Sequence, residues 1–64
     1  KPLSNRQHWI LAVLRDRGRV TRDVVEKEFD IGEKQAKREL GGLTKRGIVQ
    51  FIRKPWPGHY VLRA

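Results

Sequence analysis

The first part of the chain alternates hydrophobic and polar residues with the period of an α-helix. Apolar residues in segment 5–17 recur at that period and cover a wide arc of the helix. Ser4 precedes the segment and Gln7 follows three positions later, which is the pattern of an N-terminal capping box. Gly18 suits the left-handed conformation that ends many helices. The pattern predicts a helix over residues 5–17 that contacts more than one neighbouring element.

Two further helices are predicted by the same kind of signal. Thr21 is a favourable N-cap residue for a helix over residues 22–29. The third helix is predicted over residues 33–46, between a capping Gly32 and a terminating Gly47. On a helical wheel its apolar residues span only about 60°, so it is expected to pack by a narrow stripe. That stripe consists of Ala36, Leu40 and Leu43.

After the third helix the hydrophobic period changes from helical to extended. Segments 48–53 and 59–63 are rich in β-branched and aromatic residues, which favour strands. A five-residue loop with two prolines, residues 54–58, separates them and predicts a β-hairpin. Residues 19–20 add a candidate edge strand. The expected fold is α+β, with three helices and a hairpin of two to three strands in a single domain, residues 1–64.

The composition bounds the class of protein. Sixty-four residues allow one domain, and the absence of cysteine excludes disulfides and thiol-based metal sites. No run approaches the roughly 18 apolar residues that a membrane span needs. A cytoplasmic location is expected. The chain starts at Lys1 without Met, and we expect a terminal module cut from a longer protein.

The net charge of +8 is unevenly distributed along the chain. Residues 33–64 carry eight basic and two acidic groups, whereas residues 1–32 carry seven basic and five acidic groups. This asymmetry favours a polyanionic partner on one side of the domain. A basic surface kept for solubility is the alternative interpretation.

The predicted third helix places much of that charge opposite its apolar stripe. Lys34, Arg38 and Lys45 fall within about 40° of one another on the wheel. Gln35 and Lys37 flank this row. A helix of this kind can pack into a small core by one side and offer cations to nucleic acid by the other, although an ordinary solvated face has the same composition.

Three segments resemble parts of known winged helix-turn-helix proteins. Residues 31–40, IGEKQAKREL, are similar to the V-S-x-x-T-x-R-R-D-L recognition segment of DeoR-type repressors. Residues 47–49 and 60–62, GIV and YVL, resemble segments that flank the wing in the C-terminal winged helix of some Fic-family and RecG-like ATPase-related proteins. The resemblance covers about residues 5–62. It implies a bacterial winged helix-turn-helix domain that binds double-stranded DNA in transcription regulation.

The resemblance also implies which surfaces contact DNA. It puts helix 33–46 in the major groove and wing 53–59 on the backbone or in the minor groove. The helix residues that it places in the major groove or on its phosphates are Lys34, Gln35, Lys37 and Arg38. Long basic side chains pair well with guanine, so the chemistry of the row agrees with this placement.

The chain departs from the family pattern at several positions. Gly32 replaces the usual Ser and supplies no hydroxyl for a phosphate, and Gln35 replaces the usual Thr and suits adenine edges. Gly41 and Gly42 lie inside the predicted third helix, where each glycine costs about 1 kcal/mol relative to alanine. They mark either a loosened or ending helix, or a place where a phosphate backbone or a partner approaches closely.

The hairpin loop is the second candidate surface. Arg53, Lys54 and His59 surround Trp56 at its tip. Trp56 either contacts a sugar or base, or folds back on Pro55 or Tyr60 and caps the core. Lys45, at the end of the third helix, is either a phosphate contact or a solvated charge.

Catalytic chemistry is not expected of this chain. The two histidines lack metal-ligand spacing, and the only serine is explained as a helix cap. No glycine-rich phosphate loop follows a strand. We therefore expect no enzyme activity, no cofactor and no metal.

Two other functions compete with duplex binding. The wide apolar arc of helix 5–17, with Trp9 and Leu11 at its edges, would suit a protein-interaction or dimerisation winged helix attached to a larger Fic-like or ATPase-related protein. Its partner would be a second copy or other domains of the parent protein, with no membrane involved. RNA or single-strand binding through stacking on Trp56 and Tyr60 is the other alternative.

Overall fold

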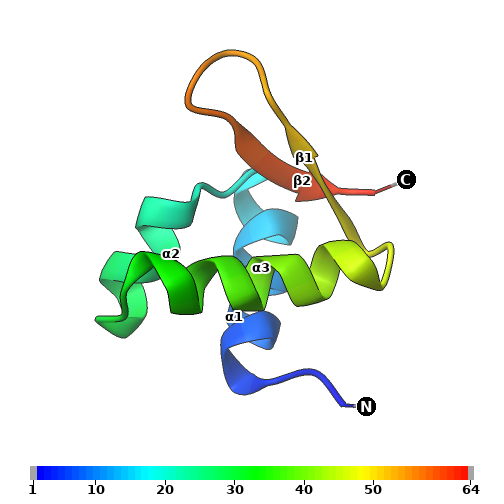
Figure 1. Ribbon diagram of the computed structural model, residues 1–64. Helices are drawn as coiled ribbons and strands as arrows, with labels where there is room; N and C mark the ends of the chain where they lie inside the picture. The colour runs from blue at the N-terminus through cyan, green and yellow to red at the C-terminus, as the bar shows by residue number, and fades with distance from the viewer. Residues whose placement is uncertain (1, 64) are drawn as a thin grey trace.

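The computed structural model describes residues 2–63, which form three helices followed by a two-stranded antiparallel hairpin. Helix α3 crosses in front of α1, and the hairpin stands above the C-terminal half of α3 (Figure 1). The predicted α+β class is confirmed, and the arrangement is consistent with a small winged helix. The elements are α1 (Asn5–Arg17), α2 (Arg22–Phe29), α3 (Glu33–Lys45), β1 (Val49–Ile52) and β2 (His59–Leu62).

The ends of the helices follow local hydrogen bonding. The Ser4 side chain accepts from the Gln7 backbone N–H at 3.1 Å, and the Gln7 side chain accepts from the Ser4 N–H at 3.0 Å, which confirms the capping box. Thr21 occupies the N-cap position of α2, but its hydroxyl bonds to Asp23 rather than to the backbone. Helix α3 ends one residue earlier than predicted, with Arg46 as its C-cap.

The core lies between the three helices and the start of the hairpin. Its central side chains are fully shielded from water and come from every helix and from β1. Each fully buried aliphatic side chain contributes about 1.5–3 kcal/mol relative to the exposed state. The apolar stripe of α3 is buried as predicted, so the opposite side of this helix is fixed toward solvent. The residues with essentially no exposed area are Ile10, Val25, Ala36, Leu40, Leu43 and Val49.

The predicted edge strand at residues 19–20 is reduced to a single bridge. Val20 pairs with Tyr60, donating to its carbonyl at 3.1 Å and accepting from its N–H at 2.8 Å. Both strands of the hairpin are shorter than the predicted segments 48–53 and 59–63. The bridge ties the connection between α1 and α2 to the base of the wing.

The glycine pair does not loosen or end α3, because the helix continues through both residues to Lys45. At Gly42 an added Cβ would lie 2.6 Å from Gln7 Nε2. That amide donates to the Glu39 carbonyl at 3.2 Å. The space above Gly42 is therefore filled by a side chain of α1, and not by a phosphate or a partner. Gly41 has nothing within 4 Å of an added Cβ and leaves an open edge on the helix.

The wing loop is held at its base by another close glycine contact. Gly58 is buried, has a φ of 94°, and lies against the ring of Phe51. Its N–H donates to the Pro55 carbonyl at 2.8 Å. A side chain at this position would collide with Phe51 and strain the backbone. The loop that carries Trp56 is thus closed by a hydrogen bond between Pro55 and Gly58 and packs on Phe51 through Gly58.

Candidate nucleic-acid interface

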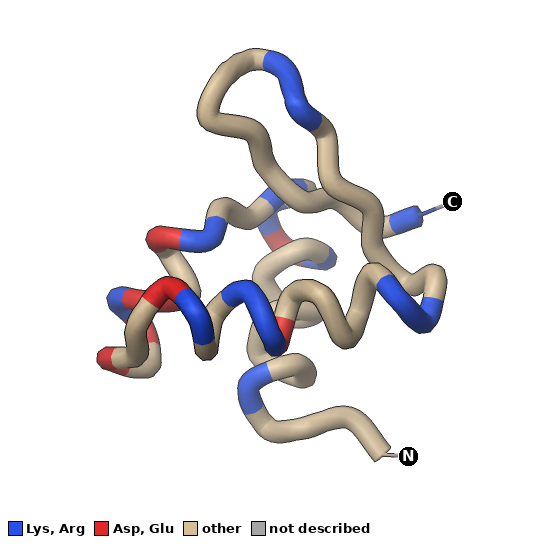
Figure 2. Tube along the Cα trace, viewed as in Figure 1, with Lys and Arg blue, Asp and Glu red and all other residues tan. Residues whose placement is uncertain are grey.

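The outward side of α3 carries a row of three cations, Lys34, Arg38 and Lys45. They lie opposite the buried stripe, are exposed, and extend over roughly 16 Å of the helix. Within residues 2–63 none of them forms an ion pair. Figure 2 shows basic residues along α3 and on the wing, while acidic residues gather around α2 and the start of α3. The row is therefore a cationic surface with no acidic partner from the rest of the described chain.

Lys37 differs from the row because it already has an anionic partner. Its Nζ lies 3.1 Å from Glu33, which also pairs with Arg22 at 3.4 Å, and Arg22 contacts Glu26 at 2.8 Å. The hydrogen bond from Lys37, followed by the positive charges of Arg22 and Lys37, lowers the pKa of the Glu33 carboxyl. Exposed pairs of this kind contribute little to stability, so a phosphate can replace Glu33 as the partner of Lys37.

Gln35 and the Gly32 cap complete the N-terminal part of this surface. On the helical wheel Gln35 lies on the opposite side of the cationic row from Lys37. Its side-chain amide makes no hydrogen bond within the described part of the chain. Gly32 caps α3 through its backbone only, as expected from the missing hydroxyl. The first turns of α3 therefore present free donors and acceptors next to the cations.

A groove runs between the cationic row and the wing. It has a volume of about 690 Å³, and its floor, on the wing side, is formed by the rings of Phe51 and Tyr60, which are tilted by 53° with their centroids 5.0 Å apart. Arg38 and Lys45 border it from α3, with Gly41 as the open edge between them. A second hollow of about 370 Å³ continues past Lys37 toward the start of α2. The groove has an aromatic floor and a basic rim.

The aromatic floor of this groove was not predicted from the sequence. From the sequence, Tyr60 is predicted only as a packing partner of Trp56 or as a stacking residue for single strands, and no role is predicted for Phe51. In the structure Phe51 is 45% exposed and Tyr60 half-buried. They are directly opposite each other in the strand register, and cross-strand aromatic pairing is the sequence signal that would have placed them together.

The wing tip presents Trp56 to solvent, which corrects the alternative in which this side chain caps the core. Trp56 is 90% exposed and does not fold back on Pro55 or Tyr60 to cover buried residues. Arg53 and Lys54 are exposed beside it and form no ion pair within residues 2–63. The three side chains Arg53, Lys54 and Trp56 thus form a second free surface, named here the wing tip.

His59, expected at the wing tip, lies apart from this surface. It is half-buried in the first position of β2, where it pairs with Ile52. Its Nδ1 is buried and has no hydrogen-bond partner. The imidazole therefore packs against the hairpin and is not presented to a ligand in the way that Lys54 is.

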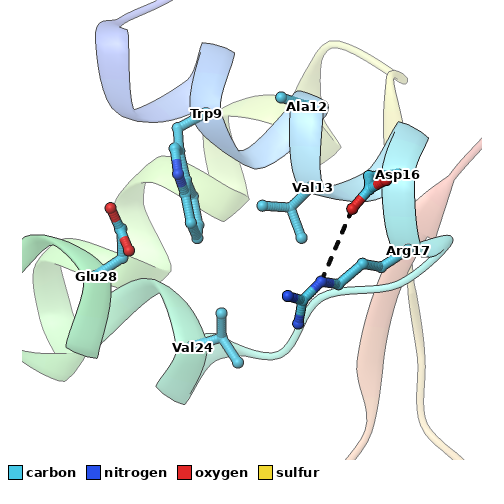
Figure 3. A pocket seen from close by; sticks show the side chains of 7 residues that line it. All are labelled: Trp9, Ala12, Val13, Asp16, Arg17, Val24 and Glu28. Atoms are coloured by element: carbon cyan, nitrogen blue, oxygen red, sulfur yellow. Dashed lines mark ion pairs between the residues drawn. The ribbon is translucent and has the colours of Figure 1, made fainter.

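Most of the apolar arc of α1 is used inside the domain. Leu11 is buried, and Trp9 contacts the ring of Phe29 edge-on with centroids 5.2 Å apart. What remains is a shallow hollow of about 440 Å³ between α1 and α2 (Figure 3). It is lined by Trp9, Ala12, Val13, Asp16, Arg17, Val24 and Glu28. The protein-interaction hypothesis rests on this hollow.

Other kinds of site find little support in the described residues. Residues 2–63 contain no group of three His, Cys, Asp or Glu side chains placed to hold a metal ion. None of the helices in the same range is long and apolar enough to span a bilayer.

Comparisons with protein-family models, curated proteins and solved structures gave no match. The resemblance to DeoR-type repressors and to Fic-family and RecG-like proteins stays a prediction.

Proposed function

We propose that this domain binds double-stranded DNA, with α3 in the major groove and the wing on the adjacent backbone or minor groove, as part of a transcription regulator. The observation that carries the proposal is the unpaired row of Lys34, Arg38 and Lys45. An α-helix fits the major groove, and its exposed basic side chains then reach both base edges and phosphates. The opposite stripe of α3 is buried, so this row has a defined orientation.

The groove between α3 and the wing supports the same geometry. A DNA strand lying in it would contact Lys45 with its phosphates and Phe51 with its sugars. The second cationic surface, Arg53 and Lys54, lies beyond the groove on the wing. Two separate sets of cations joined by an apolar floor suit a ligand whose negative charge repeats along its length. A compact anion would use one set alone.

Arg38 is the residue most suited to a base contact, because it lies in the middle of the row and has no protein partner. Replacing Arg38 with alanine is expected to weaken binding to a mixed-sequence duplex about tenfold and to relax specificity at one base pair. Fluorescence anisotropy over a salt series measures the affinity and its salt dependence. Selection from a randomised duplex library, followed by sequencing, measures the specificity.

The matched control for this experiment is Arg15→Ala, which removes an exposed arginine from α1. Arg15 also lacks an ion pair within the described residues. Affinity and specificity should stay near wild type in that variant. An Arg38→Ala protein with unchanged affinity and salt dependence would contradict the placement of α3 in the major groove.

A further inference from the structure

The wing tip exposes a large aromatic surface that the fold does not use. Trp56 is 90% exposed, whereas the other exposed large hydrophobic side chains, Val24, Phe51 and Leu62, keep 39–45% of their area in water. Trp56 is absent from the aromatic contacts that join Trp9 to Phe29 and Phe51 to Tyr60. Covering an indole of this size in a complex is strongly favourable, since apolar burial scales with area.

The loop presents this indole in a restricted conformation. Pro55 and Pro57 flank Trp56 and fix their own φ angles. The hydrogen bond from the Gly58 N–H to the Pro55 carbonyl closes the loop beneath it, and Phe51 packs on Gly58. Binding through Trp56 would therefore order little additional backbone.

The charges around Trp56 define the chemistry of its partner. Loop segment 53–59 contains two cations and no acidic residue. Cations next to an exposed aromatic ring match a nucleic acid, in which phosphates flank flat bases. An apolar pocket of a protein could bury the Trp56 side chain. It would interact favourably with Arg53 and Lys54 only if acidic residues surrounded the pocket.

We propose that Trp56 is an apolar wedge that enters the minor groove and inserts between base pairs of the duplex held by α3, and that it kinks the DNA there. The proposal rests on the duplex binding proposed above. Inserted apolar side chains partly unstack a base step, and the bent DNA then covers more protein surface. Here the bend would bring the backbone toward Arg53 and Lys54. Trp56 on the wing would bend the DNA, while the row of cations on α3 would fix the position of the domain along the duplex.

Replacing Trp56 with alanine is expected to weaken duplex binding roughly tenfold, in keeping with the loss of one stacked aromatic contact. The slope of log affinity against log salt should become less steep, because DNA that is not bent no longer brings its backbone to Arg53 and Lys54. Trp56→Phe should keep most of the affinity. Val24→Ala, which removes an exposed apolar side chain from α2, is the matched control. Circular dichroism checks that each variant is folded.

Two further measurements test insertion directly. Trp9→Phe leaves Trp56 as the only tryptophan, since the chain has two. Its fluorescence should be quenched when a mixed-sequence duplex is added and should not be quenched by heparin. Energy transfer between dyes at the duplex ends should rise with wild type and stay near the free-DNA value with Trp56→Ala. A duplex with a flexible TA step should bind more tightly than one with a stiff A-tract.

The outcomes separate the wedge from the duplex-binding proposal. Wild type that binds no duplex at low salt overturns both. Duplex binding that depends on Arg38 but not on Trp56 overturns the wedge alone. Trp56→Ala that weakens binding to single-stranded oligonucleotides but not to duplexes replaces the wedge with single-strand stacking. Weaker duplex binding without quenching or bending also overturns insertion.

Discussion

A chain in which both Lys34 and Arg38 are replaced with glutamate is expected to lose duplex binding by roughly a thousandfold or more at moderate salt. Two free cations at the centre of the proposed interface would become two anions facing phosphates. Any residual binding should depend less on salt, because about two fewer phosphates are neutralised. Each lost phosphate contact makes the slope of log affinity against log salt less steep by about 0.9. Both side chains are exposed and lie opposite the buried stripe, so folding should be retained.

The control for this variant places the same charge change on other helices. Arg15 and Lys27 are exposed residues of α1 and α2, and their double replacement with glutamate alters the net charge equally. Affinity should then fall only modestly, through the weaker overall attraction. Fluorescence anisotropy at matched salt compares the two proteins. Equal losses would mean that total charge, and not the row on α3, governs binding.

Replacing Gly42 with valine is expected to destabilise the domain by about 2–3 kcal/mol, a large share of the roughly 3–10 kcal/mol available to a chain of this length. The new side chain would collide with the Gln7 amide, which lies 2.6 Å from the position of Cβ. Gln7 would have to leave the Glu39 carbonyl and the Ser4 N–H, two hydrogen bonds that attach the start of α1 to α3 and close its cap. Chemical denaturation measures the loss.

Gly41→Ala is the matched control for this prediction, because Gly41 has open space around it. Alanine is favoured over glycine in a helix interior, so this variant should gain about 0.5–1 kcal/mol. Adding Gln7→Ala should remove the collision and reduce the cost of Gly42→Val in a double-mutant cycle. The same cost in both backgrounds would show that the Gln7 contact is not the cause.

Local signals in the sequence were sufficient to place the helices. The capping box of Ser4 and Gln7 and the terminating Gly18 act within one turn, so they could be identified without any tertiary information. The narrow stripe of α3 likewise defined which side of the helix is buried. The Glu33–Lys37 pair has the i,i+4 spacing of a helical ion pair, and this spacing could have indicated that Lys37 is less free than Arg38.

Features that depend on distant parts of the chain could not be predicted in the same way. The packing of Gln7 on Gly42 joins two helices, and nothing around either residue alone indicates it. The exposure of Trp56 depends on how the loop closes over Gly58 and Phe51, so the sequence allowed two arrangements. The aromatic floor of the groove required the register of the hairpin, which brings Phe51 opposite Tyr60.

The most direct test of the account is an NMR titration of the isotope-labelled domain with a mixed-sequence DNA duplex. We expect the amide shifts that change with DNA to cluster on residues 33–46 and 53–59, and to diminish as salt is raised. The side-chain resonance of Trp56 should be among them. Shifts confined to the hollow around Trp9 and Val24, or no shifts at low salt, would contradict duplex binding through α3 and the wing.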